Sequence, residues 1–248
     1  MTERVVNKLA GEFEKRHVAV DCFRIEAASA CDIDLSAYDL LGMAYPVHAF
    51  NAPEIAVDFA KRLPESGSIG TFVIHTAGEE SKVNFAASDL LIKILGKKGY
   101  NVFYNRLVEM PSNFIIKHDA ARVGRLFSRA NEGIPRIAQD IVALEPHSMQ
   151  RGLVVRVLAA LGRAEWPGAR ILGKFFYARS SCTRCGTCED NCPNRNIAMG
   201  GKAVAFKWRC GLCMRCVYRC PSSSISIRRP FRFLIFDEWY DFQAEGGL

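Results

Sequence analysis

The chain has 248 residues, of which 49% are hydrophobic, and a formal net charge of +7. This size and composition are sufficient for one large or two ordinary globular domains. No apolar run reaches the roughly 18 residues that a membrane span requires, and no charged-then-apolar signal segment opens the chain. We therefore expect a cytoplasmic protein without a membrane span. The ten cysteines of such a chain more often bind metal than form disulfides.

The first 145 residues alternate helical and strand patterns, which is typical of a βαβ protein. Apolar residues at the helical period and short apolar or alternating runs locate the elements. The last helical pattern contains Pro135, where we expect a kink or a restart. In chain order, the sequence predicts helices at 5–13, 55–63, 85–95 and 119–144, and strands at 18–22, 38–43, 72–75 and 101–108.

Residues 146–179 are predicted to be a helical connector containing the basic amphipathic stretch RGLVVRVLAALGR. Two interpretations fit this stretch: a helix that packs across a domain junction, or a membrane-surface helix with Arg151, Arg156 and Arg163 on its polar side. We favour the first. The aromatic tail, residues 230–248, is predicted to dock on a neighbouring surface.

Two copies of the pattern CxxCxxCxxxCP occur in residues 180–229, 28 residues apart (210 − 182). Three thiolates of one such loop can hold three corners of a 4Fe-4S cluster, while the cysteine before the proline binds the other cluster. This rule predicts two clusters. The first takes Cys182, Cys185, Cys188 and Cys220, and the second takes Cys210, Cys213, Cys216 and Cys192.

The duplicated motif resembles the bacterial two-cluster ferredoxin. The alternative is a pair of zinc sites in a nucleic-acid-binding module, because residues 151–248 carry 16 Lys+Arg against 7 Asp+Glu. Zinc sites usually use two CxxC pairs on a longer loop, so we favour iron and expect no nucleic acid as a partner. Arginines among the ligands are expected to raise the cluster potentials or to bind an acidic redox partner: Arg184, Arg195, Arg209, Arg215 and Arg219. Cys22 and Cys31 are expected to be inert packing residues.

The first part of the chain is similar to a flavodoxin. DLLGMAYPVHAF resembles the third strand and its loop, TFVIHTAGEES resembles the next flavin-facing loop, and NVFYNRLVEMPSNF matches the fifth strand and the M-P-x-N that follows it in one branch. With the ferredoxin motif, the whole chain resembles flavodoxin-ferredoxin fusion proteins of the EFR type. The resemblance implies an α/β doubly wound parallel sheet over residues 1–145, in the order 2-1-3-4-5, followed by a small α+β ferredoxin domain.

The resemblance also implies FMN at the carboxyl ends of the strands. The residues that match its site are Thr2, Pro46, Val47, His48, Ala49, Thr76, Ala77 and Gly78. The family begins with a central strand and an S/T-x-T-G-N-T/S loop for the FMN phosphate. This chain opens with MTERVVNKLAGEF, so that strand and loop are missing and FMN binding is in doubt.

A sheet of order 2-1-3-4-5 without its first strand leaves ladder hydrogen bonds unmade on strands 2 and 3. We therefore expect either that the natural protein starts roughly 10 to 15 residues earlier, enough for a strand and a loop, or that strands 2 and 3 pair directly. The first option is favoured, because Thr2 and Glu3 fall at the expected junction of loop and helix.

These patterns lead to two main functional hypotheses. The first is a flavodoxin-ferredoxin fusion that carries electrons through two 4Fe-4S clusters, with FMN as a possible further cofactor. The alternative is a ferredoxin whose flavodoxin-like part is a flavin-free docking module. The sequence offers no convincing catalytic acid or base, which favours an electron carrier over an oxidoreductase with its own substrate. Redox proteins are the expected partners.

Overall fold

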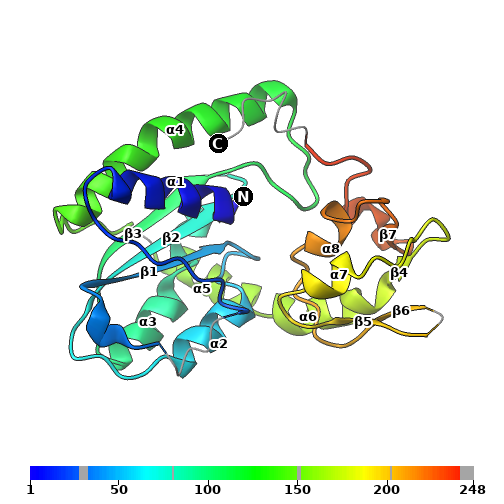
Figure 1. Ribbon diagram of the computed structural model, residues 1–248, viewed down its shortest axis with the longest axis horizontal. Helices are drawn as coiled ribbons and strands as arrows, with labels where there is room; N and C mark the ends of the chain where they lie inside the picture. Colours follow the sequence, from blue (N-terminus) through cyan, green and yellow to red (C-terminus); the bar gives the residue numbers. More distant parts are fainter. Residues whose placement is uncertain (28–32, 80, 150–151, 202, 241–248) are drawn as a thin grey trace. The chain divides into compact units, whose positions relative to one another are not determined.

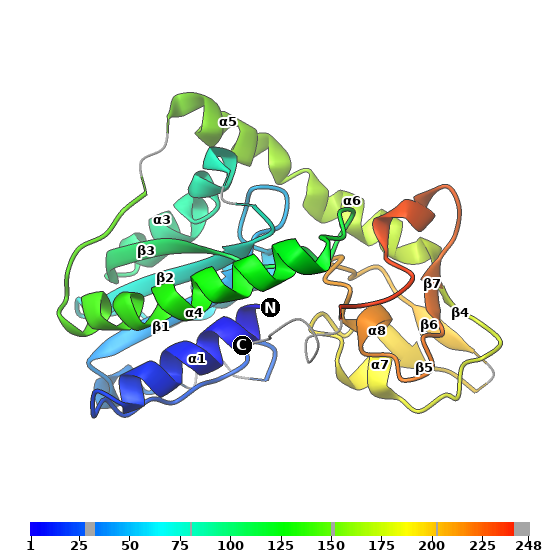
Figure 2. The ribbon, with the colours of Figure 1, turned by 90° about the horizontal axis from the view of Figure 1, so that it is seen from above.

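The computed structural model describes residues 1–27, 33–79, 81–149, 152–201 and 203–240. These residues form two compact units (Figures 1 and 2). Unit 1 comprises Met1–Pro111 and His118–Arg163. Unit 2 comprises Ala164–Tyr240 together with the short segment Ser112–Lys117. No helix among the described residues is long and apolar enough to cross a membrane.

Unit 1 contains a parallel three-stranded sheet in the order β1-β2-β3, formed by β1 (Leu40–Pro46), β2 (Gly70–Ala77) and β3 (Asn101–Glu109). The central strand β2 is buried along most of its length, which explains why its sequence is apolar without alternation. The predictions of strands at 38–43, 72–75 and 101–108 are confirmed. The parallel sheet with helices supports an α/β fold for this part of the chain.

Helices cover both faces of the sheet (Figures 1 and 2). α2 (Glu54–Arg62) and α3 (Asp89–Lys97) connect consecutive parallel strands and pack together on one face, as crossovers of one hand require. α1 (Thr2–Glu14) and α4 (Ala120–Val142) pack together on the other. Pro135 lies inside α4, which continues to Val142, so the helix does not restart there; the Arg16 guanidinium donates a hydrogen bond of 3.0 Å to the Pro135 carbonyl.

The predicted strand at residues 18–22 is wrong, because the structure has no regular element there. These residues follow α1 as an extended segment whose side chains are exposed or half-buried. A strand needs a neighbour to complete its ladder of hydrogen bonds, and none of the described strands pairs with this segment: β1 pairs only with β2. The alternative that the second and third family strands meet directly is therefore not observed either.

Unit 2 is built from very short elements. Its two antiparallel sheets have two strands each, β4 paired with β7 and β5 paired with β6. Its helices and strands are α6 (Glu165–Leu172), β4 (Phe176–Ala178), α7 (Thr187–Asp190), β5 (Ile197–Met199), β6 (Val204–Phe206), α8 (Arg215–Tyr218) and β7 (Ile225–Ile227). Unit 2 also has 3-10 turns at Gly173–Phe175 and Phe231–Leu234. The 3-10 turns of unit 1 are Leu35–Ala37 and Lys82–Ala86.

The 28-residue duplication of the sequence is also a duplication of structure. Adding 28 to the residue numbers of β4, α7 and β5 gives β6, α8 and β7. The repeats are interleaved: the first strand of repeat 1 (residues 174–201) pairs with the last strand of repeat 2 (residues 202–229), and the last strand of repeat 1 pairs with the first strand of repeat 2. Each sheet therefore contains one strand from each repeat.

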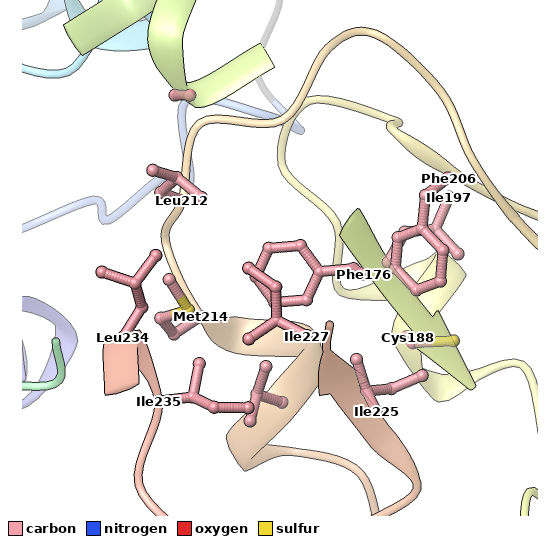
Figure 3. Close-up of a cluster of buried hydrophobic side chains, with 12 residues drawn as sticks. Phe176, Cys188, Ile197, Phe206, Leu212, Met214, Ile225, Ile227, Leu234 and Ile235 are labelled. Carbon is pink, nitrogen blue, oxygen red and sulfur yellow. The ribbon is translucent and has the colours of Figure 1, made fainter. Parts of the chain in front are cut away.

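The core of unit 2 lies between these two sheets and the two short helices (Figure 3). Phe176 of β4 and Phe206 of β6 stack with ring centroids 6.0 Å apart, and Ile225 and Ile227 project from β7 into the same cluster. The described part of the aromatic tail docks on this unit as predicted, since Trp239 stacks on Tyr218 with ring centroids 4.0 Å apart. Residues 241–248 of the tail lie outside the described residues.

Candidate metal centre

The four cysteines of each predicted cluster line one cavity of unit 2. One cavity is lined by three thiols of the second motif together with Cys192 from the first. The other is lined by three thiols of the first motif together with Cys220 from the second. The cysteine before each proline thus reaches across to the other repeat. The complete sets are Cys210, Cys213, Cys216 and Cys192 in one cavity and Cys182, Cys185, Cys188 and Cys220 in the other.

The two ligand loops have the same backbone conformation. Each loop contains residues with positive φ, a conformation that side chains other than glycine adopt rarely, and each such residue has a counterpart 28 positions along the chain. Five of the six are not glycine, so these turns are imposed by the loop as a whole. The pairs are Arg184 and Leu212, Gly186 and Met214, and Arg195 and Ser223.

Backbone hydrogen bonds to sulfur are repeated as well. The Asn196 amide donates to Cys192 Sγ at 3.2 Å, and the Ser224 amide donates to Cys220 Sγ at 3.2 Å. Both donors stand four residues after the cysteine that precedes proline. Hydrogen bonds to the sulfurs of an iron-sulfur cluster favour the more negative state and adjust its potential.

The pKa values of the thiols are shifted differently in the two cavities. Burial raises the pKa of the Cys213 and Cys216 thiols, and raises that of Cys210 to about 12. In the other cavity, Cys185 is exposed and its pKa is lowered by a 3.2 Å hydrogen bond with the Thr187 hydroxyl. The thiols of the second motif therefore depend more strongly on a bound metal to exist as thiolates.

Two further thiols of the first-motif cavity have pKa values that are shifted in opposite directions. Burial raises the pKa of Cys188. For Cys220, burial acts in the same direction, but hydrogen bonds from Ser222 and from the Ser224 amide outweigh it and leave the pKa lowered. The first-motif cavity thus contains thiols whose environments already favour the charged form as well as one whose environment does not.

Zinc and a 4Fe-4S cluster require different arrangements of thiolates. A single tetrahedral zinc binds thiolates at about 2.3 Å, so its sulfurs lie roughly 4 Å apart. Within the described part of the chain, no group of three or more His, Cys, Asp or Glu side chains is arranged to hold a single ion. In a 4Fe-4S cluster each thiolate binds a different iron, which needs a wider set of sulfurs around a cavity. The four cysteines that line each cavity fit such a group.

Two residues that support the second-motif cavity were not identified from the sequence. A Cβ atom at Gly173 would lie 2.1 Å from Cys210 Cβ, so only glycine allows this approach. Asn113 donates its side-chain amide to the Cys213 carbonyl at 3.3 Å. Asn113 belongs to the segment Ser112–Lys117, which follows β3 in the sequence but is part of unit 2. The M-P-x-N pattern was a signal for Asn113, although its contact was not predictable.

The arginines among the ligands are arranged in different ways. The Arg184 guanidinium donates to the Gly201 carbonyl at 2.9 Å, and that of Arg219 donates to Asn191 Oδ1 at 2.8 Å. The charge of Arg215 counteracts the effect of burial on the pKa of Cys213. Arg195 and Arg209 are exposed. Positive charge is therefore present both beside a ligand and on the surface of unit 2.

Some residues that match the flavin site come together in unit 1. The hydroxyls of Thr2 and Thr76 form a hydrogen bond of 2.7 Å, although they are 74 residues apart in the sequence. Pro46 at the end of β1 is in register with Thr76 in β2, and the Val47 amide donates to the Thr76 carbonyl at 2.7 Å. Thr2, the end of β1 and the end of β2 therefore meet at the carboxyl edge of the sheet.

The loop after β1 is held by contacts of its own. His48 and Asn51 form two backbone hydrogen bonds, and the Asn51 side chain donates to the Ala49 carbonyl at 3.0 Å. Burial lowers the pKa of His48 to about 4, so its ring is neutral at neutral pH. Of the two residues after Thr76, Ala77 ends β2 and accepts a hydrogen bond from the Met110 amide at 2.9 Å, and Gly78 is half-buried just beyond it.

The two cysteines outside the motifs have different outcomes. Cys22 is exposed and lies in an extended segment rather than a strand, so the prediction that it packs in the interior is wrong. Its environment raises its pKa, first through partial burial of the sulfur and then through the charges of Glu14 and Asp21. Cys31 lies outside the described residues.

Comparison with known proteins supports unit 2 as an iron-sulfur domain. Residues 174–221 match the family model described as a 4Fe-4S dicluster domain. This range begins within the 3-10 turn that precedes β4 and includes all eight motif cysteines. A search of curated proteins finds no match to the chain. The match covers the first repeat and most of the second, ending before β7, and it supports a ferredoxin-like iron-sulfur domain, a class of domain that transfers electrons.

Proposed function

We propose that the protein is an electron carrier whose unit 2 holds two 4Fe-4S clusters, one in each cysteine-lined cavity. The observation that carries this proposal is the composition of the two cavities: each collects three thiols of one motif and the fourth thiol of the other motif. This is the arrangement that two-cluster ferredoxins use. The match to a dicluster domain supports it.

The chain contributes positioning, hydrogen bonds and charge to this function. When bound, the clusters supply one-electron transfer. The eight cysteines would hold them, and the amides of Asn196 and Ser224 would donate to the sulfurs of Cys192 and Cys220. Exposed Arg195 and Arg209 give unit 2 a positive surface that suits an acidic redox protein, which we propose as the partner class.

Iron and sulfide analysis of anaerobically prepared protein tests the metal content. We expect about eight irons and eight sulfides per chain, and a broad absorption band near ~400 nm that bleaches on reduction. A colourless protein with about two zinc ions per chain would instead support the nucleic-acid-binding alternative. A Cys22→Ser variant is the matched control, because this thiol lies outside both cavities and its loss should leave the iron content unchanged.

The exchange of ligands between the motifs is tested by Cys192→Ala. Because Cys192 lines the cavity of the second motif, we expect this variant to damage the cluster held by Cys210, Cys213 and Cys216 and to spare the other. Cys220→Ala should produce the reverse pattern. EPR spectra of the reduced variants resolve the two clusters, and loss of the first-motif cluster in Cys192→Ala would refute the assignment.

A flavin site at the carboxyl edge of the sheet is a second candidate, favoured by the Thr2–Thr76 hydrogen bond. Two hydroxyls that already meet there could bind polar atoms of FMN, and the half-buried loops after β1 and β2 would flank its ring system. Titration with FMN, followed by fluorescence quenching, tests this candidate. Saturable binding that Thr76→Val weakens would support it. Absence of binding would leave the flavin-free docking module as the role of unit 1.

A further inference from the structure

Helix α5 (Leu153–Gly162) presents an unusual surface. Four of its aliphatic side chains are largely exposed, with exposed fractions of 76% for Leu153, 72% for Val154, 49% for Val157 and 67% for Leu161. Leu158, at 38%, extends the same face. Positions 153, 154, 157, 158 and 161 follow the helical period, so they form one continuous stripe. An amphipathic helix of a globular domain normally turns this stripe toward the core.

The opposite face of α5 is firmly attached to unit 1. Ala159 is 4% exposed, and its carbonyl accepts a hydrogen bond of 2.5 Å from the Asn51 side chain. A Cβ atom at Gly162 would lie 2.1 Å from the Ala49 carbonyl oxygen, so the helix approaches this loop as closely as glycine permits. The exposed stripe is therefore fixed outward by contacts on the inner face.

The segment that contains the stripe carries only positive charge, and it is flanked by Glu145 and Glu165. Residues 146–164 include three arginines and no aspartate or glutamate. Arg156 lies 3.3 Å from Asp89 of unit 1 and is still 63% exposed. Arg163 follows the helix directly and is half-buried. Both stand beside the aliphatic stripe, where their long side chains can reach a polar boundary while the stripe is buried.

We propose that α5 is a membrane-surface anchor that lies in the plane of an anionic phospholipid bilayer. The aliphatic stripe would enter the boundary between headgroups and acyl chains, and Arg156 and Arg163 would contact the lipid phosphates. The complementarity of charge supports this occupant, because residues 146–164 carry no carboxylate that an anionic surface would repel, and the neighbouring Asp89 carboxylate is paired with Arg156. This inference does not depend on the clusters of unit 2.

The size and composition of the stripe argue against a protein occupant. A ten-residue helix is about 15 Å long and about 10 Å wide, and a stable protein interface buries about 800 Å² on each partner. The stripe supplies only a small part of that area. It also contains no aromatic residue, although Trp and Tyr dominate the energetic centres of protein interfaces and Leu and Val are under-represented there. Binding to an anionic bilayer adds electrostatic attraction to the contribution of a small apolar area.

Vesicle flotation of the full-length protein tests the proposal. The probes are vesicles of phosphatidylcholine alone and vesicles with about a third phosphatidylglycerol. We expect the protein to bind the anionic vesicles. Its affinity for the neutral vesicles should be lower by about five-fold for each arginine at the surface, the equivalent of about 1 kcal/mol. The variant L153Q/L161Q should reduce anionic-vesicle binding at least ten-fold, since two leucines no longer enter the bilayer.

The controls separate this helix from other sources of binding. Glutamine is a good helix former and both leucines are exposed, so circular dichroism should show L153Q/L161Q folded. Phe23→Gln is the matched control, because Phe23 is 65% exposed elsewhere in unit 1, and it should bind like the parent. Equal binding of parent and L153Q/L161Q would overturn the proposal. A second result would also overturn it: light scattering that shows a dimer for the parent and a monomer for L153Q/L161Q. The stripe would then bind a second copy of the chain.

Discussion

The two units reach stability by different routes. Unit 1 has strands of seven to nine residues and a helix of 23 residues, and its core includes Leu91, Tyr104 and Phe127 at 0% exposure. Unit 2 has strands of three residues and, at the ligand loops, helices of four. Its core is smaller and includes cysteines. Regular structure and apolar burial stabilise the first unit, whereas we expect the second to depend on bound metal for its stability.

Removal of iron should separate the two units most clearly. We expect a chelator, added under reducing conditions, to unfold unit 2, because the energy of metal binding is also its folding energy. Unit 1 should keep its structure. Hydrogen exchange measured by mass spectrometry would show lost protection at β4–β7 and retained protection at β1–β3. Equal protection of unit 2 before and after chelation would mean that this unit, like unit 1, is stable without metal.

A cavity in the core of unit 1 should have the next largest effect. Phe127→Ala removes a fully buried ring and should lower the free energy of unfolding of unit 1 by about 3–5 kcal/mol. The iron content of unit 2 should not change. Urea unfolding measures the first quantity and iron analysis the second. The control is Leu144→Ala in the same unit, where the side chain is 59% exposed and the expected change is below about 0.5 kcal/mol.

A methyl group at Gly173 should disturb unit 2 alone. Gly173→Ala places a carbon against Cys210, and we expect overpacking of about 1–3 kcal/mol, seen as partial loss of the second-motif cluster. Gly168→Ala in α6 is the matched control, because nothing lies within 4 Å of the added Cβ there, and alanine favours a helix. If both variants retain full iron, the close approach to Cys210 is unimportant for the cluster.

The smallest effect is expected at Asn113. Asn113→Ala removes a hydrogen bond to the Cys213 carbonyl, which is typically worth about 1 kcal/mol, or roughly five-fold in a rate. Iron should leave the second-motif cluster faster by about that factor, measured with a chromogenic chelator. Asn191 donates to the Thr187 carbonyl at 2.8 Å beside the other cavity, so Asn191→Ala should accelerate loss from the first-motif cluster instead. An identical response of both clusters would contradict this assignment.

Much of unit 1 could be predicted because its elements are long and periodic. The prediction of a helix at 55–63 is confirmed by α2, and the strand at 101–108 by β3. The conformation of residues 18–22 could not be predicted from their periodicity, because alternation of apolar and polar residues shows only that a segment is able to join a sheet. Whether it does depends on a neighbour with free ladder groups. The same limit applies to α5, whose apolar stripe indicated a helix but not the direction that the stripe faces.

The candidate site was predictable where ligand chemistry restricts the sequence. The spacing of the eight cysteines, repeated after 28 residues, is enough by itself to indicate two cluster loops. Gly173 and Asn113 gave no such signal of their role, because each acts through an approach to a cysteine that is distant in the sequence. Glycine and asparagine occur for many local reasons, so their tertiary contacts cannot be predicted from residue type.

The interleaving of the two repeats constrains how unit 2 can form during synthesis. β4, at residues 176–178, completes its sheet only with β7, at residues 225–227, so the first repeat has no partner for this strand until nearly the whole unit has left the ribosome. Such distant pairing slows folding, because a long loop must close before its contacts form. During that interval the cysteines are exposed in an open chain. Cluster insertion is therefore expected to follow completion of the chain, and to stabilise the folded state of unit 2 once its distant strands have paired.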